Sequence, residues 1–201
     1  MYCSSSSSSS SSEQQEVRSK LLKTYHDRVD IMPKGLKETS SLISIGFDVF
    51  ETAPNTYTQS RVDLQLNPLD NEVFVVYAVD LDLGAPDAVA GTSTVMRGAL
   101  TTTSQAAMVD LSNTACIARK NMQIRAGGFV DGGVGFMTGS NESPATQLEY
   151  LAIIATNDFF ISCEGINNVA PHGLSGKLYG VRAKADSAIY AALVQSEVLT
   201  S

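Results

Sequence analysis

Three aspartates in the middle of the chain have the side chains best suited to hold a metal ion. Asp80 and Asp82 end the stretch Glu72–Leu83, and Asp87 follows in a loop. Carboxylate oxygens are ligands that hard cations such as Ca²⁺ prefer. The spacing is not that of an EF-hand loop, and a strand end that reaches water or another subunit explains the same residues. We therefore assign no metal-binding residue and no cofactor.

Nucleophilic catalysis needs a base close to the nucleophile, and the chain has only two histidines. His26 lies near the N-terminus, and His172 lies between Pro171 and Gly173 in a loop. No G-x-S-x-G motif accompanies them. A catalytic role for His172 is one interpretation, and a structural loop residue is the one we favour. We assign no catalytic residue and expect the protein not to be an enzyme.

Glycines gather between residues 126 and 139, where a phosphate-binding loop is one hypothesis. The segment has no G-x-G-x-x-G that opens a helix after a strand, and it lacks the Lys-Ser/Thr of a P-loop. In a β-rich chain, glycines of this kind more often mark turns, bulges and close approaches of the backbone. We assign no cofactor-binding residue here.

Basic residues that could contact nucleic acid fall into two groups. One is mixed with acidic residues near the N-terminus, as on a solvated face, and the other lies in the body. A protein that wraps nucleic acid tightly usually has a more strongly basic arm. The groups are Arg18, Lys20, Lys23 and Arg28, and Arg119, Lys120 and Arg125.

The composition favours a protein that packs against other subunits. Charged residues make up 17% of the chain, against about 25% in a typical soluble protein. Depletion of charge is a property of surfaces that become buried between subunits. The net charge is −7. The three cysteines, which include Cys116 and Cys163 in apolar runs, contain no C-x-x-C pair, so we predict neither a disulfide framework nor a zinc site.

The first 40 residues are predicted to be an extended N-terminal arm. Nine consecutive serines at 4–12 cannot bury apolar surface, so this tract should be flexible. Residues 16–27 have helical spacing of apolar side chains and predict a short helix. No signal peptide and no transmembrane helix is expected.

Residues 41–201 are predicted to form one antiparallel β domain. Runs of alternating or apolar residues are separated by turn signals about every ten residues. The stretch Glu72–Leu83 is the expected central strand, with its odd-numbered residues on one apolar face and Asp80 and Asp82 on the other. The other predicted strands are 41–50, 61–66, 94–100, 114–118, 121–125, 147–154, 158–164 and 177–185.

The last segment, 186–199, fits two structures. Ile189, Tyr190, Leu193, Val194 and Glu197 recur at helical spacing, while alternate residues would also suit a strand. Alanine and leucine favour the helix, which is our prediction, or else a tail that docks on the domain.

An arm of about 40 residues, followed by about 160 residues of low-charge β chain, resembles a single jelly-roll capsid protein of a small virus. The resemblance lies in the succession of strand runs, such as SLISIGFDVF, RVDLQL, EVFVVYAVDLDL and DFFISCEG. It implies an all-β, two-sheet jelly-roll sandwich that self-assembles into an icosahedral shell of the virion and is made in the host cytoplasm.

The resemblance also implies the partners, which are copies of the same chain and other capsid proteins. Because the arm lacks an Arg/Lys-rich run, we expect at most weak contact of the arm with a genome or an internal membrane. The alternative functions are another β-sandwich interaction module, such as a phage decoration, tail or fibre protein or a lectin-like adhesin, and, as the weakest hypothesis, an enzyme on a β scaffold.

Overall fold

The computed structural model describes residues 32–126, 136–140 and 148–199, and the chain divides into two compact units, residues 1–34 and 35–201. The serine tract, the helix expected at 16–27, His26 and the basic residues of the arm lie outside the described residues. All the described strands belong to the second unit.

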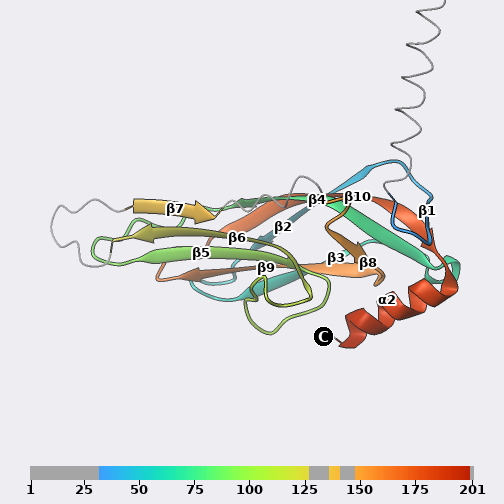
Figure 1. Ribbon diagram of the computed structural model, residues 1–201. Helices are drawn as coiled ribbons and strands as arrows, with labels where there is room; N and C mark the ends of the chain where they lie inside the picture. The colour runs from blue at the N-terminus through green and yellow to red at the C-terminus, as the bar shows by residue number, and fades with distance from the viewer. Residues whose placement is uncertain (1–31, 127–135, 141–147, 200–201) are drawn as a thin grey trace, which may run out of the picture. The chain divides into compact units, whose positions relative to one another are not determined.

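Two antiparallel sheets form the described part of this unit, as Figure 1 shows. In the first, which we name sheet A, β10 pairs with β4 on one side and with both β1 and β2 on the other, and β4 pairs with β8. Its strands are β1 (Leu36–Glu38), β2 (Ile43–Phe50), β4 (Glu72–Leu83), β8 (Ala152–Ile154) and β10 (Gly173–Ala185).

The second sheet, sheet B, has the order β3, β9, β5, β6, β7. Both sheets are antiparallel throughout their described strands, which confirms the all-β, two-sheet prediction. The strands are β3 (Thr58–Asp63), β5 (Thr94–Thr101), β6 (Cys116–Arg125), β7 (Phe136–Ser140) and β9 (Asp158–Ile166).

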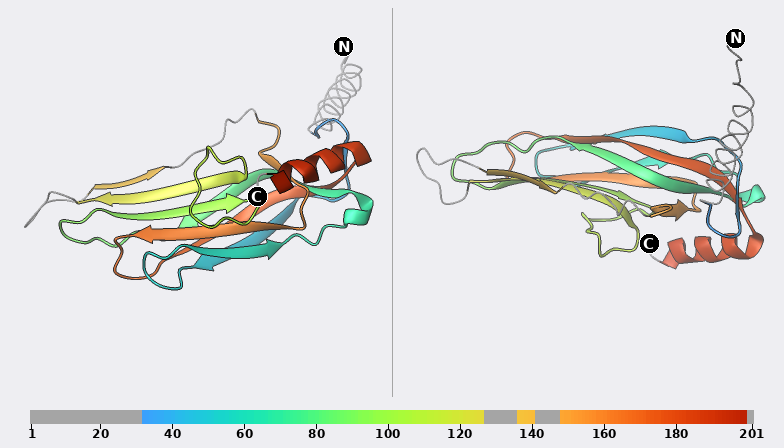
Figure 2. Two further views of the ribbon diagram at one scale, coloured as in Figure 1. Left: turned by 90° about the horizontal axis from the view of Figure 1, so that it is seen from below. Right: turned by 45° about the horizontal axis from the view of Figure 1, so that its top comes forward.

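The hydrophobic core lies between the sheets, which face each other in Figure 2. Phe47 of sheet A and Phe159 of sheet B meet edge to face across it, with ring centroids 5.8 Å apart. Apolar side chains from alternate positions of both sheets fill the rest of this layer. They include Phe74, Leu81, Leu174 and Leu178 from sheet A, and Met96, Leu100, Ile161 and Cys163 from sheet B.

The bounds of the central strand β4 were predicted correctly. The prediction that all its odd-numbered residues share one apolar face was wrong. Tyr77 is an extra residue, because Tyr179 and Gly180 of β10 pair with Ala78 and Val76. Such a bulge reverses which face the later residues point to. Phe74 and Val76 therefore share the core with the odd-numbered residues that follow the bulge, Leu81 and Leu83.

Three other strand predictions differ from the structure. Residues 114–118 and 121–125 are not two strands, because β6 runs without a turn from Cys116 to Arg125. The strand expected at 61–66 is β3, which ends at Asp63, although Leu64 and Leu66 beyond it are still buried. Of the run 147–154, the structure describes residues 148–154, and only β8 is a strand there.

The C-terminal segment is a helix, α2 (Ser187–Leu199), as the helical spacing predicted. Asp186 precedes it, and its carbonyl accepts the first helical hydrogen bond from the backbone N–H of Tyr190 at 2.8 Å. Among the side chains of α2 whose burial is described, those wholly or partly buried are the predicted stripe, Ile189, Tyr190, Leu193, Val194 and Glu197.

Candidate assembly surfaces

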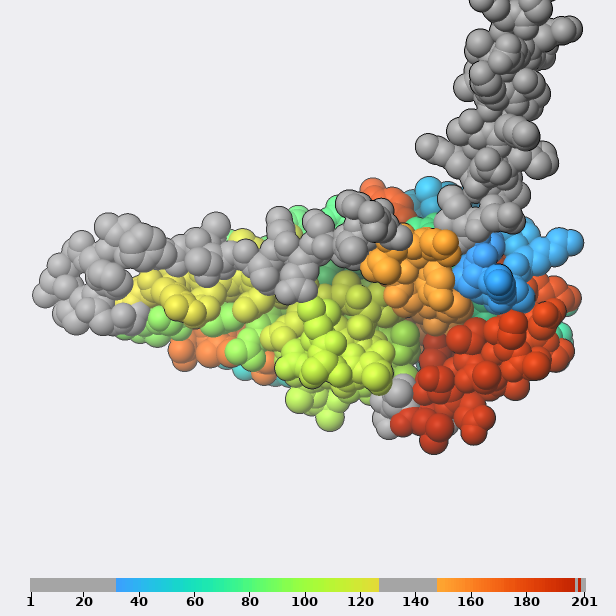
Figure 3. Space-filling model, in the orientation of Figure 1, coloured from blue at the N-terminus to red at the C-terminus, as the bar shows by residue number. Residues whose placement is uncertain are grey.

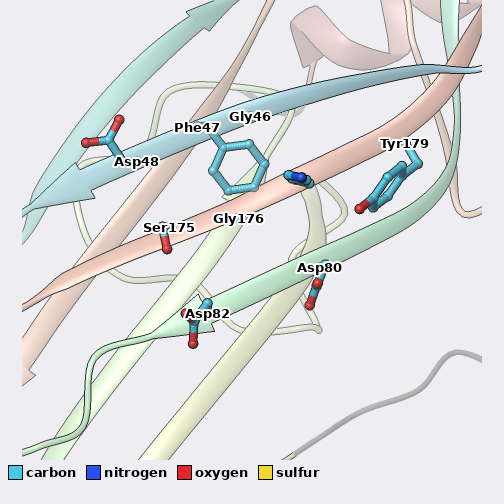
Figure 4. Close-up of a pocket in the computed structure, with 9 residues that line it drawn as sticks. Gly46, Phe47, Asp48, Asp80, Asp82, Ser175, Gly176 and Tyr179 are labelled. Atoms are coloured by element: carbon cyan, nitrogen blue, oxygen red, sulfur yellow. The ribbon is translucent and has the colours of Figure 1, made fainter.

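The outer face of sheet A, which points away from the core, has a polar patch that we call the acidic patch. Ser175 of β10 lies opposite Asp82 of β4 on one side and Asp48 of β2 on the other. One row along, Lys177 lies opposite Asp80. The three carboxylates are exposed, and Figure 4 shows them around a shallow hollow of about 430 Å³. Gly46, Phe47, Gly176 and Tyr179 also line this hollow.

The geometry does not bring the three candidate metal ligands together. Asp80 and Asp82 share the acidic patch, whereas Asp87 lies in the next loop and binds backbone groups there. Asp48, which joins the patch from β2, was not singled out by the sequence. No group of three or more ligating side chains in the described residues is arranged to hold a metal ion.

One end of the sandwich is tied together by the buried carboxylate of Glu51, which is 3% exposed. Its Oε1 accepts hydrogen bonds from the backbone N–H groups of Thr56 at 3.2 Å and Gly165 at 2.7 Å. Its Oε2 accepts one from the N–H of His172 at 2.9 Å. A buried charge is tolerated when hydrogen bonds replace its water. Glu51 thus holds the ends of three strands in register.

Asp87 and His172 belong to the same end. The Oδ2 of Asp87 accepts from the backbone N–H groups of Val169 and Ala170 at 2.8 and 2.9 Å. These two hydrogen bonds lower the pKa of Asp87, and the bond from Ala170 has the larger effect. His172 Nε2 lies 3.2 Å from Asp87 Oδ1, an ion-pair distance when the imidazole is protonated. This arrangement supports a structural role for the histidine.

Asn168 completes the network, which we call the loop-end network. Its Nδ2 donates to the carbonyl of Val95 at 2.9 Å, and its Oδ1 accepts from the N–H of Asp87 at 3.0 Å. Its own N–H donates to Asn55 Oδ1 at 2.7 Å. Asn168 is 5% exposed, so its polar atoms are satisfied within the chain.

The outer face of sheet B contains a patch of arginines, which we call the basic patch. Arg97 of β5 lies opposite Asn121 of β6 and opposite Glu164 of β9. Arg119 and Arg125 alternate with Asn121 along β6, so they share this face. The Nε atoms of Arg97 and Arg119 and the Oδ1 of Asn121 are out of contact with solvent and make no hydrogen bond within the described part of the chain.

The basic cluster expected at Arg119, Lys120 and Arg125 is therefore only partly correct. Successive residues of a strand point to opposite faces, and Lys120 points the other way. Its Nζ donates to the carbonyl of Leu81 in sheet A at 2.6 Å. Arg97 was not recognised from the sequence, because it joins the patch only through the pairing of β5 with β6.

The loop at 102–115 runs beside the basic patch. Tyr57 Oη donates to the carbonyl of Gln105 at 3.1 Å, and Ser104 Oγ donates to Gln59 Oε1 at 2.8 Å, so the loop is tied to β3. In Figure 3 this loop, in lime, and α2, in red, occupy the lower part of the visible face. Asp110 in this loop has a pKa lowered chiefly by hydrogen bonds from Ser112, with a smaller contribution from the charge of Arg119.

The helix α2 is fixed at its far end by a second buried carboxylate. Glu197 is 8% exposed, and its two oxygens accept from the N–H groups of Ala155 and Thr156 at 3.0 and 2.9 Å. Burial raises the pKa of Glu197, and these hydrogen bonds oppose the rise. The helix is therefore latched to the turn between β8 and β9.

The two described cysteines are unpaired thiols. Burial raises the pKa of Cys163 to about 12, and this residue is fully enclosed in the core. Burial also raises the pKa of Cys116, which is partly exposed. Cys163 fits the expected role of a small core residue.

The glycine-rich region falls mostly outside the described residues. Only Ala126 and the backbone of β7, which contains Gly139, are described. The hypothesis of a phosphate-binding loop there stays a prediction. In the part of the chain that the structure describes, no helix has the length and apolar character needed to cross a membrane.

No protein-family model matches the chain, and no curated protein matches it significantly.

Proposed function

We propose that the sandwich is a jelly roll and that the protein is a structural protein that self-assembles into a viral capsid shell. The proposal rests on the order in which the strands pair: an early strand pairs with a late one, and each following pair lies inside the previous pair along the sequence. β2 pairs with β10, β3 with β9, β4 with β8, and β5 with β6. A long hairpin rolled up on itself produces this order, and jelly rolls of this kind recur in viral capsid and lectin domains.

The low charge and the exposed apolar side chains of the surface support assembly into an oligomer rather than a monomer. The chain has few charges for its size, and large apolar side chains project from the described surface. Phe50 at the end of β2 is 62% exposed, and Val169 beside the loop-end network is 74% exposed. Contacts between symmetry copies would bury such residues. The shell would be part of the virion, with the chain made in the host cytoplasm.

The N-terminal arm would tie neighbouring copies together. Because β1 pairs with β10, the segment from Gly35 onward belongs to the sandwich, and residues 1–34 are the part available for this role. Deleting residues 1–34 is expected to give smaller or less stable particles. Particles of unchanged size and thermal stability would contradict the tying role.

Size-exclusion chromatography with light scattering of the full chain tests the proposal. A closed particle of megadalton mass is the expected result. A monomer or trimer at all concentrations would overturn it and would favour another β-sandwich interaction module, such as a decoration or fibre protein.

A further inference from the structure

We propose that the basic patch of one copy docks on the acidic patch of the next copy in the assembled shell. The inference rests on the proposed self-assembly and names the surfaces that meet. Its starting point is how the unpaired charges of the described residues are distributed between the two outer faces.

The charges on the two faces are opposite. On sheet A, Asp48, Asp80 and Asp82 surround the single ammonium group of Lys177. On the outer face of sheet B, three arginines lie with the unpaired carboxylate of Glu164. Within the described part of the chain, none of these eight residues forms an ion pair. The other charges of β3 and β9 on that face, Arg61, Asp63 and Asp158, pair with one another at 2.7 and 3.0 Å. Elsewhere exposed charges do pair, as Lys184 does with Asp70 at 3.5 Å.

The arginines form no ion pair in the described chain, although the charge of Asp110 in the neighbouring loop acts on Arg119. Arg97 and Arg119 are diagonal neighbours on adjacent strands, which brings two like charges close together. Their Nε atoms and the Oδ1 of Asn121 are enclosed but unbonded. Partly buried guanidinium groups are stabilised by carboxylates, which they bind with paired N–H groups. An acidic partner would relieve the repulsion between the two guanidinium groups.

A second copy of this chain is the partner that the charges favour. The acidic patch is exposed on three adjacent strands, and its one lysine would face the one glutamate of the basic patch. The two patches lie on different faces of one molecule, so the contact is heterologous: each copy binds one neighbour through its basic patch and another through its acidic patch. Complementary charges of this kind set the register and orientation of an interface.

A charge-reversal series tests the contact. Arg97→Glu with Arg119→Glu should raise the concentration needed for half-assembly by about tenfold or more at low salt. Asp80→Arg with Asp82→Arg should do the same. The four substitutions together restore opposite charges across the contact, so assembly should return towards the wild-type concentration. The control for the arginine double variant, Lys37→Glu with Lys184→Glu, lowers the net charge by the same amount at exposed positions away from both patches and should assemble like wild type.

Light scattering gives the particle mass, and circular dichroism with thermal unfolding shows that each variant is folded.

Failure of the folded wild type to assemble would overturn the proposed function itself. If the wild type assembles and the double variants assemble equally well, only this contact is wrong. Double variants that assemble normally but lose nucleic acid, seen as a lower ratio of absorbance at 260 to 280 nm, would show that the basic patch binds phosphate instead. If the variant with all four substitutions stays unassembled, this would also contradict the pairing of the two patches.

Discussion

The loop-end network and the basic patch both hold polar groups out of contact with water, but they differ in how these groups are satisfied. In the loop-end network, Glu51 and Asn168 are hydrogen-bonded within the chain, and His172 Nε2, which makes no hydrogen bond, lies 3.2 Å from the carboxylate of Asp87. Arg97 and Arg119 have Nε atoms with no partner. A buried polar group without a hydrogen bond costs free energy, so the arginines of the basic patch are less completely satisfied than Glu51 and Asn168.

The largest effect is expected at Glu51. Glu51→Ala leaves three backbone N–H groups without an acceptor, so the free energy of unfolding should fall by at least about 3 kcal/mol, since each orphaned group costs about 1–3 kcal/mol. Urea unfolding measures this loss. Glu51→Gln keeps one acceptor oxygen and should lose less. A loss below about 1 kcal/mol for the alanine variant would mean that the network does not hold the loops.

A pH-dependent effect is expected at Asp87. Its pKa is lower in the folded protein than in the unfolded chain, so ionised Asp87 stabilises the fold above about pH 4 and this contribution disappears as the pH falls through the folded pKa. Asp87→Asn should therefore lower the Tm at pH 7 more than at pH 3.

The control for this prediction is Asp48→Asn, because the exposed Asp48 carboxylate accepts no hydrogen bond from the described residues. Its Tm should follow the wild-type pH profile. An Asp87→Asn variant whose Tm falls equally at both pH values would contradict a role for the ionised carboxylate.

The smallest effect on stability is expected in the basic patch. Arg97→Met and Arg119→Met remove no hydrogen bond of the described chain, so the free energy of unfolding should stay within about 0.5 kcal/mol of wild type. Arg182→Met is the matched comparison. Arg182 donates to the carbonyls of Leu64 and Gln65 at 3.0 and 3.2 Å, and its loss should cost about 1–2 kcal/mol. If all three variants lost the same free energy of unfolding, the arginines of the basic patch would not differ from the hydrogen-bonded Arg182.

Much of the fold follows from local patterns in the sequence. The bounds of β4 and the buried stripe of α2 were predicted because period 2 and period 3.6 are visible in the residues themselves. The bulge at Tyr77 was not predictable, because an extra residue shows only when the partner strand fixes the register. The merged strand β6 was missed because Arg119 and Lys120 look like a turn between two short apolar runs.

The candidate surfaces were harder to predict for the same reason. Asp80 and Asp82 were visible as neighbours on one strand, but Asp48 joins them only across β10. Arg97 meets Arg119 only through the pairing of β5 with β6. The role of Glu51 depends on backbone groups from residues more than 100 positions away. Long-range pairing of this kind leaves no mark in a single sequence.

Electron microscopy of the native assembly is the most direct test of the central claim. We predict closed icosahedral particles in which the face of β5 and β6 that contains Arg97 and Arg119 contacts the face of β4 that contains Asp80 and Asp82 in a neighbouring copy. An absence of particles, or particles in which both faces lie open to solvent, would contradict the account.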